Sequence, residues 1–412
     1  MARKRIAFAG ASARAVVMYA TPLAKDFADV VELVGVYDVN QGRGRLLGRK
    51  CGLDVPVFSD FDAMMKTTKP DIVIVTTVDR FHHEFIIRSL DYGCDVVTEK
   101  PMTIDEAKAR EILAAEKRSG HKVTVTFNYR FAPFATRIRE LIKEGQIGTP
   151  LSVHFEWMLD TSHGADYFRR WHRRKQNSGG LLVHKATHHF DLVNWWIDDQ
   201  PEVVNAFGAL RYYGKNGAFR GTNCRTCAHQ GECTFYWNIA AEPVMLEYYV
   251  DNESEDGYLR DGCVYAEEID IEDTMSVQVK YRRGALMSYT LTAYAPYEGF
   301  RLVINGSEGR LEAEDLHGGV GAFANQSIYR LRLYNRRNEE ITIKVPDASG
   351  GHGGGDERLL DMTFRGGMPD PLKHAAGSGD GARSILVGVA GNLSIREHRS
   401  VRIDELLTET RT

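Results

Sequence analysis

Four side chains in this sequence have the types and spacing needed for proton transfer. Lys100 lies between a glutamate and a proline, directly after a short apolar run. His184, His188 and Asp191 are separated by four and three residues, so on a helix they share one face. A histidine, with a pKa of about 6.5, exchanges protons near neutrality, whereas a lysine, at about 10.4, needs desolvation or neighbouring cations to act as a base. The sequence therefore predicts acid–base chemistry carried by histidine, with a lysine beside it.

A second pattern, at the end of the first apolar run, indicates nucleotide binding. Gly10 begins the segment GASARA, at a place where amides at a helix N-terminus can meet a pyrophosphate. Ser12 and Ala15 replace the second and third glycines of the usual fingerprint, so an ordinary tight turn is an alternative. The cofactor contacts expected from this segment are Gly10, Ser12, Ala13 and Arg14.

Asp38 ends the second apolar run and strengthens that interpretation. A carboxylate at this point accepts hydrogen bonds from a ribose diol and repels a 2′-phosphate, which favours NAD over NADP. Arg43 and Arg45 follow closely, and they leave NADP binding open as the less favoured alternative. The alternative to ribose binding is that Asp38 is only a turn residue at the end of a strand.

Four cysteines, Cys224, Cys227, Cys233 and Cys263, belong to a glycine-rich and charged stretch. Four thiolates suit a tetrahedral structural zinc site, which would order a segment that has no core of its own. An iron–sulfur cluster, free thiols or a single disulfide are the alternatives.

Two loops are candidates to complete a substrate pocket. Residues 167–175 form a basic and aromatic run in which Trp171 would stack on a sugar and Arg173 would bind hydroxyl or carboxylate groups. A glycine-rich loop at 349–355 places His352 near the substrate, unless it is only a linker. For each loop a solvated surface segment is the alternative.

His184 and His188 also have the spacing of two metal ligands on a helix. With His163 they form an alternative zinc site that would polarise an alcohol.

The elements that must position these residues fall into two parts. Residues 1–127 alternate apolar runs with helical patterns, which predicts βαβ units and a parallel, Rossmann-type sheet. Residues 128–412 predict an α+β domain with a large, mostly antiparallel open sheet, interrupted by an irregular insertion at about 212–273. Residues 180–196 are expected as one helix. The fold class is α/β.

The composition excludes several kinds of protein. The chain has 412 residues, 43% of them hydrophobic, and a formal net charge of −4, so it has no electrostatic drive toward nucleic acid or an anionic membrane. It contains no apolar run of the roughly 18 residues that a membrane span needs. Six cysteines in so long a chain fit a reducing cytoplasm.

Taken together, the motifs resemble the Gfo/Idh/MocA family of sugar and polyol dehydrogenases. The matching segments are 77–82, 99–101, 128–131, 145–148, 179–191 and 304–309. The resemblance implies a Rossmann domain with a nicotinamide cofactor, a second domain whose sheet mediates a homodimer or homotetramer, and a carbohydrate substrate. The cofactor contacts that it adds are Thr77, His82, Glu99, Lys100 and Asn128.

The resemblance also assigns the catalytic roles. In the family, the residue at the position of His188 exchanges the proton of the substrate alcohol. The residue at the position of Lys100 binds the oxygen of the same alcohol. Many family members have an aspartate where this chain has His184, and a carboxylate there would raise the pKa of His188. We therefore expect a lower apparent pKa for oxidation in this chain. The full set of expected substrate contacts is Lys100, Arg130, His163, Trp171, Arg173, His184, Lys185, His188 and His352.

Two activities fit this pattern. The leading one is hydride transfer between NAD and a secondary hydroxyl of a sugar, glycoside or polyol. The alternative is glycoside cleavage, in which tightly bound NAD oxidises one carbon transiently and permits elimination at its neighbour. A sensor without catalytic activity is disfavoured by the presence of both Lys100 and His188.

Overall fold

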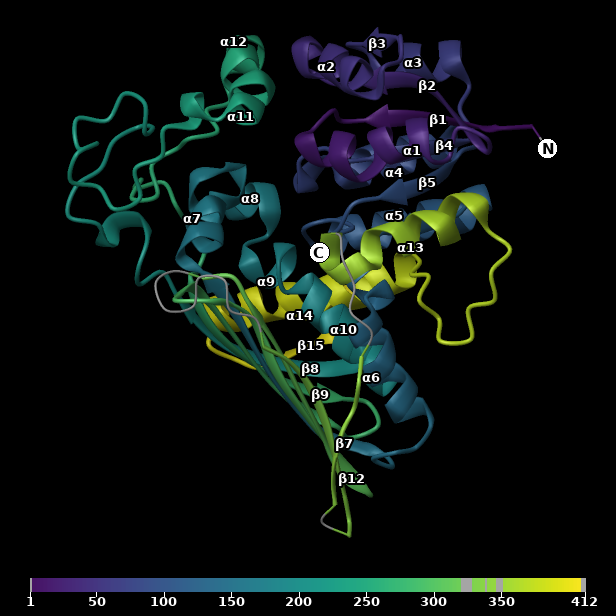
Figure 1. Cartoon of the computed structure of the whole chain (residues 1–412), viewed down its shortest axis with the longest axis vertical. Coiled ribbons are helices and arrows are strands. Elements are labelled where there is room, and N and C mark those ends of the chain that lie inside the picture. Colours follow the sequence, from purple (N-terminus) through teal and green to yellow (C-terminus); the bar gives the residue numbers. More distant parts are fainter. Residues whose placement is uncertain (1, 320–327, 338, 346–350, 409–412) are drawn as a thin grey trace.

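The computed structural model of the chain describes residues 2–319, 328–337, 339–345 and 351–408, except for the side chain of His352. Two β-sheets, of six and nine strands, organise these residues (Figure 1). The chain is therefore an α/β protein with one parallel and one mostly antiparallel sheet, as predicted.

The six-stranded sheet is parallel throughout, in the order β3-β2-β1-β4-β5-β6. Its strands are β1 (Lys4–Ala9), β2 (Val31–Tyr37), β3 (Val57–Phe58), β4 (Ile72–Val75), β5 (Asp95–Thr98) and β6 (Val123–Val125). Strand β4, with the sequence IVIV, is buried at every residue, as expected for a sheet with both faces covered. The strand order reverses between β1 and β4, and open α/β sheets bind ligands at the carboxyl ends of strands beside such a reversal.

Polar caps and left-handed residues set the bounds of the helices around this sheet. Asn40, Asp60 and Asp105 cap α2, α3 and α5 by accepting a backbone N–H with the side chain. Gly52 and Gly120 end α2 and α5 in the left-handed conformation. The helical elements are η1 (Ala15–Ala20, a π-helix), α1 (Thr21–Lys25), α2 (Gln41–Cys51), α3 (Phe61–Thr68), η2 (Asp79–Phe81), α4 (His82–Asp91) and α5 (Glu106–Ser119).

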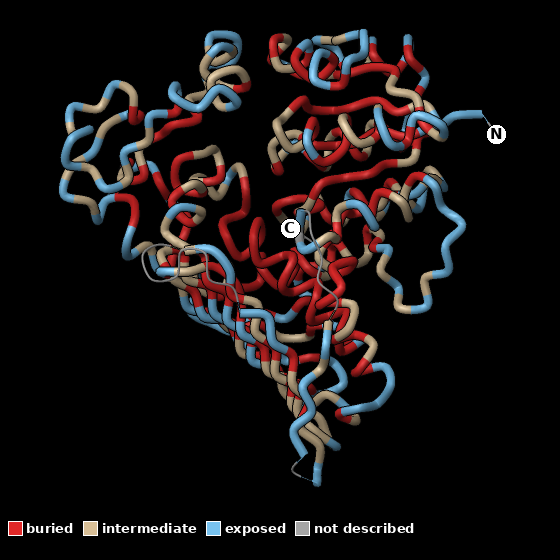
Figure 2. Tube along the Cα trace, viewed as in Figure 1, coloured by how far each residue is buried: buried red, intermediate tan, exposed pale blue. Residues whose placement is uncertain are grey.

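The nine-stranded sheet has the order β14-β13-β12-β11-β7-β10-β9-β8-β15, and only the β7–β10 pair is parallel among its described strands. Its strands are β7 (Pro150–Asp160), β8 (Pro201–Ala209), β9 (Thr274–Tyr281), β10 (Leu286–Ala295), β11 (Glu298–Gly306), β12 (Gly309–His317), β13 (Ile328–Asn335), β14 (Glu340–Thr342) and β15 (Val401–Arg402). Buried and exposed residues alternate along β9 and β10, so helices cover one face and the other is open (Figure 2).

The helical elements associated with this second sheet come from several parts of the chain. They are η3 (Asn128–Phe131), α6 (Pro133–Lys143), α7 (Thr161–Arg169), η4 (Trp171–Arg173), α8 (Lys175–Ser178), α9 (Leu181–His184), α10 (Thr187–Ile197), α13 (Gly355–Leu360), α14 (Ser378–Glu397) and α15 (Ile403–Leu407).

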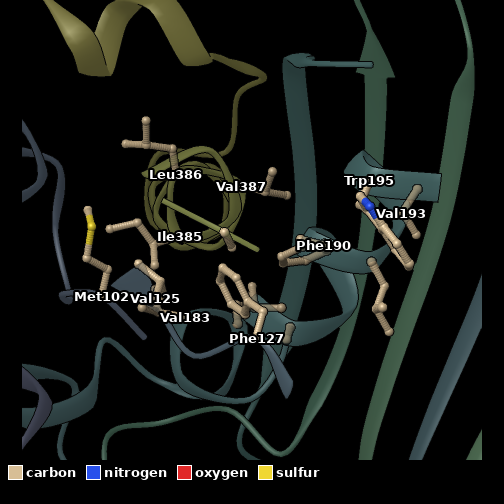
Figure 3. Close-up of a cluster of buried hydrophobic side chains, with 14 of the residues drawn as sticks. Met102, Val125, Phe127, Val183, Phe190, Val193, Trp195, Ile385, Leu386 and Val387 are labelled. Carbon is tan, nitrogen blue, oxygen red and sulfur yellow. The ribbon is translucent and has the colours of Figure 1, made fainter. Parts of the chain in front are cut away.

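The two sheets share one hydrophobic core, which holds them in a fixed relation. Figure 3 shows Met102 and Val125 of the parallel-sheet region beside Val183 of α9 and Ile385 of α14, and all four belong to one buried cluster. Helix α14 contacts α5, α9, α10 and β8. The site at the end of the parallel sheet is thus built on packed elements from both halves of the chain.

The expectation of one continuous helix over residues 180–196 is wrong. The segment divides into α9, which ends at His184, and α10, which begins at Thr187. At the break Ala186 donates its N–H to the carbonyl of Leu181, five residues earlier, instead of four. This extra residue changes the helical phase, so His184 and His188 do not project as they would from one regular helix.

The predicted insertion is irregular in the structure. Its short helices are η5 (Gly214–Asn216), η6 (Ile239–Ala241), α11 (Pro243–Tyr248), η7 (Val250–Asn252) and α12 (Glu253–Asp256), and α11 and α12 lie at the upper left of Figure 1. Tyr248 is buried in the same hydrophobic cluster as Leu46, Leu47 and Cys51 of α2. The insertion therefore extends from the second domain to the first.

Candidate active site

The turn after β1 requires glycine at position 10. Gly10 has a φ of +101°, and a Cβ on it would lie 2.8 Å from the backbone of Thr76 and Thr77. Ala11 donates its N–H to Asp38 Oδ2 at 2.6 Å, and Asn40 donates to Oδ1 at 2.7 Å. Burial raises the pKa of Asp38, and these two N–H groups oppose the shift. The tight glycine turn and the fixed carboxylate at the sheet reversal fit a dinucleotide with its ribose at Asp38.

The side chains that follow the turn link β1 to β5. Arg14 Nε donates to Glu99 Oε1 at 2.6 Å, and Tyr19 donates to the same oxygen at 2.9 Å. Burial opposes ionisation of Glu99, but Arg14 and Lys100 outweigh it and lower its pKa. Ser12 Oγ accepts the N–H of Ala15 at 3.2 Å. Arg14 and Glu99, both predicted cofactor contacts, are therefore each other's partners.

His82 joins two loops at the same sheet edge. Its Nδ1 lies 2.8 Å from the carbonyl of Pro101, and its Nε2 lies 3.1 Å from the carbonyl of Thr77. Burial lowers the pKa of His82. The imidazole therefore holds the loop that contains Lys100 against the loop that follows β4.

Lys100 lies beside the break between α9 and α10. Its Nζ donates to the backbone carbonyl of His184 at 3.4 Å. Burial lowers the pKa of Lys100 to about 8; Glu99 opposes this shift and Lys185 adds to it. A lysine with this pKa changes its charge close to neutral pH.

The imidazole of His184 is held by a residue that the sequence analysis did not select. Asp79 Oδ2 lies 2.5 Å from His184 Nδ1, and both side chains are buried. Burial raises the pKa of Asp79 well above its usual value, and burial together with Lys100 lowers that of His184. The pair therefore keeps its shared proton to a higher pH than an exposed aspartate keeps its own.

Aromatic rings form one wall around this pair. The ring of His172 lies 4.2 Å from that of His184, and Trp171 stacks on His172 at 3.5 Å. Tyr167 meets His184 edge-on at 5.6 Å. Trp171, expected to stack on a sugar, therefore has one face covered by His172.

The neighbouring polar residues of α10 point to different surroundings. His188 meets the rings of Tyr129 and Phe127 edge-on, at 5.0 and 5.9 Å. Asp191 instead accepts two hydrogen bonds from Arg130, at 2.6 and 2.7 Å. Arg130, an expected substrate contact, therefore pairs with Asp191. His188 and Asp191 are three residues apart in α10, whereas His184 belongs to α9, so the break separates only His184 from the predicted shared face.

A second charged group lies beside His163. His163 Nδ1 lies 2.8 Å from Glu298, another residue that the sequence analysis did not select. Lys185 Nζ lies 4.6 Å from the centre of the Trp157 ring, and burial lowers its pKa while Glu298 opposes the shift. Asn128 donates to Asp356 at 2.5 Å.

Part of the basic run at 167–175 forms ion pairs with acidic residues of the insertion. Arg173 pairs with Glu268 at 2.6 Å, and Lys175 pairs with Glu272. Helices η4 and α8 are therefore each connected to the insertion by an ion pair. The side chain of His352 lies outside the described residues.

The four cysteines of the insertion line one small cavity, together with Phe219 and Phe235. All are free thiols, and Arg169 Nη1 donates to Cys224 Sγ at 3.1 Å. Among the residues that the structure describes, no three His, Cys, Asp or Glu side chains are arranged to hold a metal ion. The structure thus supports neither the predicted zinc site nor the alternative set at His163, His184 and His188.

Two family models together match most of the chain. The one described as "Oxidoreductase family, NAD-binding Rossmann fold" matches residues 4–127, and "Oxidoreductase family, C-terminal alpha/beta domain" matches residues 139–403. The chain belongs to the Gfo/Idh/MocA oxidoreductase family. The predicted family membership is thereby confirmed, and the parallel sheet described above is the NAD-binding Rossmann domain of this family.

Individual relatives agree with this assignment. A Bacillus subtilis (strain 168) protein named as an oxidoreductase, YteT, is 42% identical over 429 residues, covering 98% of each chain. D-glucoside 3-dehydrogenase of Escherichia coli (strain K12) is 34% identical over 118 residues, which cover 29% of this chain and 33% of that enzyme. The WlbA dehydrogenase of Chromobacterium violaceum, solved with NADH and UDP-GlcNAcA, has a TM-score of 0.66 at 20% identity, covering 97% of this chain and 96% of its own.

This Gfo/Idh/MocA protein is therefore an NAD-binding oxidoreductase with sugar and polyol dehydrogenases among its relatives. None of the helices in the described part of the chain has the length and apolar character to cross a membrane.

Proposed function

We propose that this oxidoreductase transfers a hydride between NAD and a secondary hydroxyl of a sugar, glycoside or polyol. The observation that carries the proposal is the position of Lys100, which follows the carboxyl end of β5 and reaches the α9–α10 break beside the Asp79–His184 pair. The relative named D-glucoside 3-dehydrogenase supports a carbohydrate substrate.

The cofactor site fits NAD. The two oxygens of Asp38 accept the N–H groups of Ala11 and Asn40, and their remaining lone pairs can accept ribose hydroxyls. The tight turn at Gly10 leads from β1 into the segment whose N–H groups would meet the pyrophosphate. When bound, the cofactor supplies the hydride acceptor or donor.

Residues of the chain transfer the proton of the substrate hydroxyl and stabilise the charge of the alkoxide. Lys100, in its ammonium form, stabilises the alkoxide that develops when the substrate hydroxyl loses its proton. His188 takes this proton and returns it in the reverse direction. The Asp79–His184 pair fixes the segment that precedes His188 and adds a shared proton next to Lys100. The buried rings of Tyr167 and His172 exclude water from this pair.

We also infer self-association through the open face of the nine-stranded sheet, as a homodimer or homotetramer. Phe207 of β8 and Leu286 of β10 are exposed there, 72% and 56% respectively. Sedimentation of the purified protein measures this directly.

The activity is tested by denaturing purified protein, identifying any released dinucleotide, and screening sugars, glycosides and polyols. Net reduction of NAD on addition of a substrate supports the dehydrogenase. Release of an aglycone without net reduction instead supports the glycoside-cleaving alternative. Failure to bind any nicotinamide dinucleotide contradicts the proposal.

A further inference from the structure

The helical tip of the insertion, residues 243–256, docks on the part of the Rossmann domain that follows Asp38. Asn40 Nδ2 donates to the carbonyl of Asn252 at 2.8 Å, and Lys50 pairs with Glu247 at 2.5 Å. Tyr248, only 3% exposed, is buried in the cluster that contains Leu46 and Leu47 of α2. The contact thus combines a polar connection at the start of α2 with apolar packing along the helix.

One acidic residue of this tip, Glu255, occupies the N-terminus of α2, the helix that follows Asp38. Gly42, in the first turn of α2, donates its N–H to Glu255 Oε2 at 2.9 Å. A carboxylate at this end of a helix is stabilised by the free N–H groups and by the helix dipole. A Cβ on Gly42 would lie 1.8 Å from Asn252 Oδ1, so the two segments are in close contact.

Glu255 and Asp256 engage both arginines that follow Asp38. Arg43 forms an ion pair with Asp256, in which the side chains are 11% and 16% exposed. Arg45 pairs with Glu255 at 3.1 Å. Arginine near the end of the second Rossmann strand is the usual partner of the 2′-phosphate of NADP. Here both guanidinium groups already have carboxylate partners.

We propose that Glu255 and Asp256 restrict the cofactor to NAD by occupying the place of a 2′-phosphate. The inference rests on the proposed use of a nicotinamide dinucleotide. A 2′-phosphate at Asp38 would face three carboxylates, and the guanidinium groups that could neutralise it are held by two of them. The ribose diol of NAD carries no charge and meets no such repulsion.

The test compares the affinities of the full chain for NAD⁺ and NADP⁺ by calorimetry, which does not depend on turnover. We expect the unmodified protein to prefer NAD⁺ by about a hundredfold or more, and Glu255→Gln with Asp256→Asn to raise the relative affinity for NADP⁺ about tenfold. Adding Arg43→Ala to that double variant removes the gain, because the freed guanidinium is what binds the phosphate. Glu247→Gln, which removes a carboxylate facing Lys50, is the matched control and leaves the ratio unchanged.

Two results overturn the inference while the proposed function stands. One is that the unmodified protein binds NADP⁺ and NAD⁺ with equal affinity, a measurement that requires no variant. The other is a folded double variant, with a melting temperature near that of the control, whose affinity ratio is unchanged. If the unmodified protein binds neither dinucleotide, the proposed function and the inference both fail.

Discussion

His184 Nδ1 lies 2.5 Å from Asp79 Oδ2, and the two residues are 105 positions apart in the sequence. Asp79 begins η2, the short helix after β4, and His184 ends α9. The contact therefore connects the Rossmann domain to the helix break where Lys100 also binds. It places a carboxylate against an imidazole in a buried setting, so the charge of each depends on the other.

Asp79→Asn should keep the geometry of this contact and remove its proton exchange, because an amide oxygen still accepts a hydrogen bond. We expect kcat to fall about tenfold to a hundredfold, with NAD affinity unchanged within about twofold. Without the carboxylate the imidazolium is less stable, so the acid limb of the pH–rate profile should move to lower pH. An unchanged kcat and pH profile would show that Asp79 does not support the reaction.

Combining Asp79→Asn with His184→Asp exchanges the acidic and neutral positions of the pair. A carboxylate at position 184 favours the protonated form of His188, so the apparent pKa for oxidation should rise relative to the unmodified protein. The pH dependence of kcat/KM measures it. A shift to lower pH would contradict both this expectation and the role of His188.

Lys100 should set the alkaline limb of the same profile. Its pKa, lowered to about 8 by burial, means that the ammonium is lost as pH rises through that value. We expect kcat/KM to fall above about pH 8, and Lys100→Arg to retain a slower reaction without this fall, because arginine stays charged. An arginine variant with the same alkaline limb would assign that limb to another group.

The shifted pKa of Lys100 also has a consequence for stability. Between about pH 8 and about 10.4 the unfolded chain binds more protons at this residue than the folded chain does. The contribution of Lys100 to the free energy of unfolding should therefore rise with pH across that window. Denaturant unfolding at both ends of this pH window measures the change in the free energy of unfolding. The difference between the unmodified protein and Lys100→Met gives the contribution of Lys100.

His188→Asn should lower kcat by about 10² to 10⁴ while the protein still binds NAD, if His188 exchanges the substrate proton. The adjacent His189 is a matched control, because its Nδ1 lies 2.7 Å from Tyr289 Oη and its ring stacks on Trp157. His189→Asn should reduce stability by about 1–3 kcal/mol and leave the shape of the pH profile intact. Equal effects of the two substitutions on the profile would remove His188 from its proposed role.

Gly388→Ala should destabilise the protein although alanine is the better helix former. A Cβ at Gly388 of α14 would lie 2.3 Å from the carbonyl oxygen of Leu182, in the helix that ends at His184. We expect a loss of about 1–3 kcal/mol, measured by thermal unfolding, from the forced separation of α14 and α9. In Gly379→Ala, also in α14, the nearest atom is Arg383 Nη1 at 3.4 Å, and stability should be unchanged or slightly higher.

Much of the fold was predictable from local patterns. The apolar run of β4 and the glycine at position 10 indicated a parallel sheet with a nucleotide turn, because a strand covered on both faces needs consecutive apolar residues and a tight turn into a helix needs glycine. The break at Ala186 was not predictable in this way. It depends on one hydrogen bond to Leu181 that skips a residue, and the apolar pattern of residues 181–197 gives no sign of it.

The sequence by itself indicated the parallel and antiparallel sheets through short-range periodicity. The resemblance of its motifs, among them Lys100 after the fifth parallel strand, indicated the Gfo/Idh/MocA family. Only the tertiary structure decided which charges meet. Asp79 pairs with His184, and Asp256 pairs with Arg43, across 105 and 213 positions of the chain. Such pairs form because packing buries the groups together, and burial makes each ionised side chain depend on a partner that no local pattern specifies.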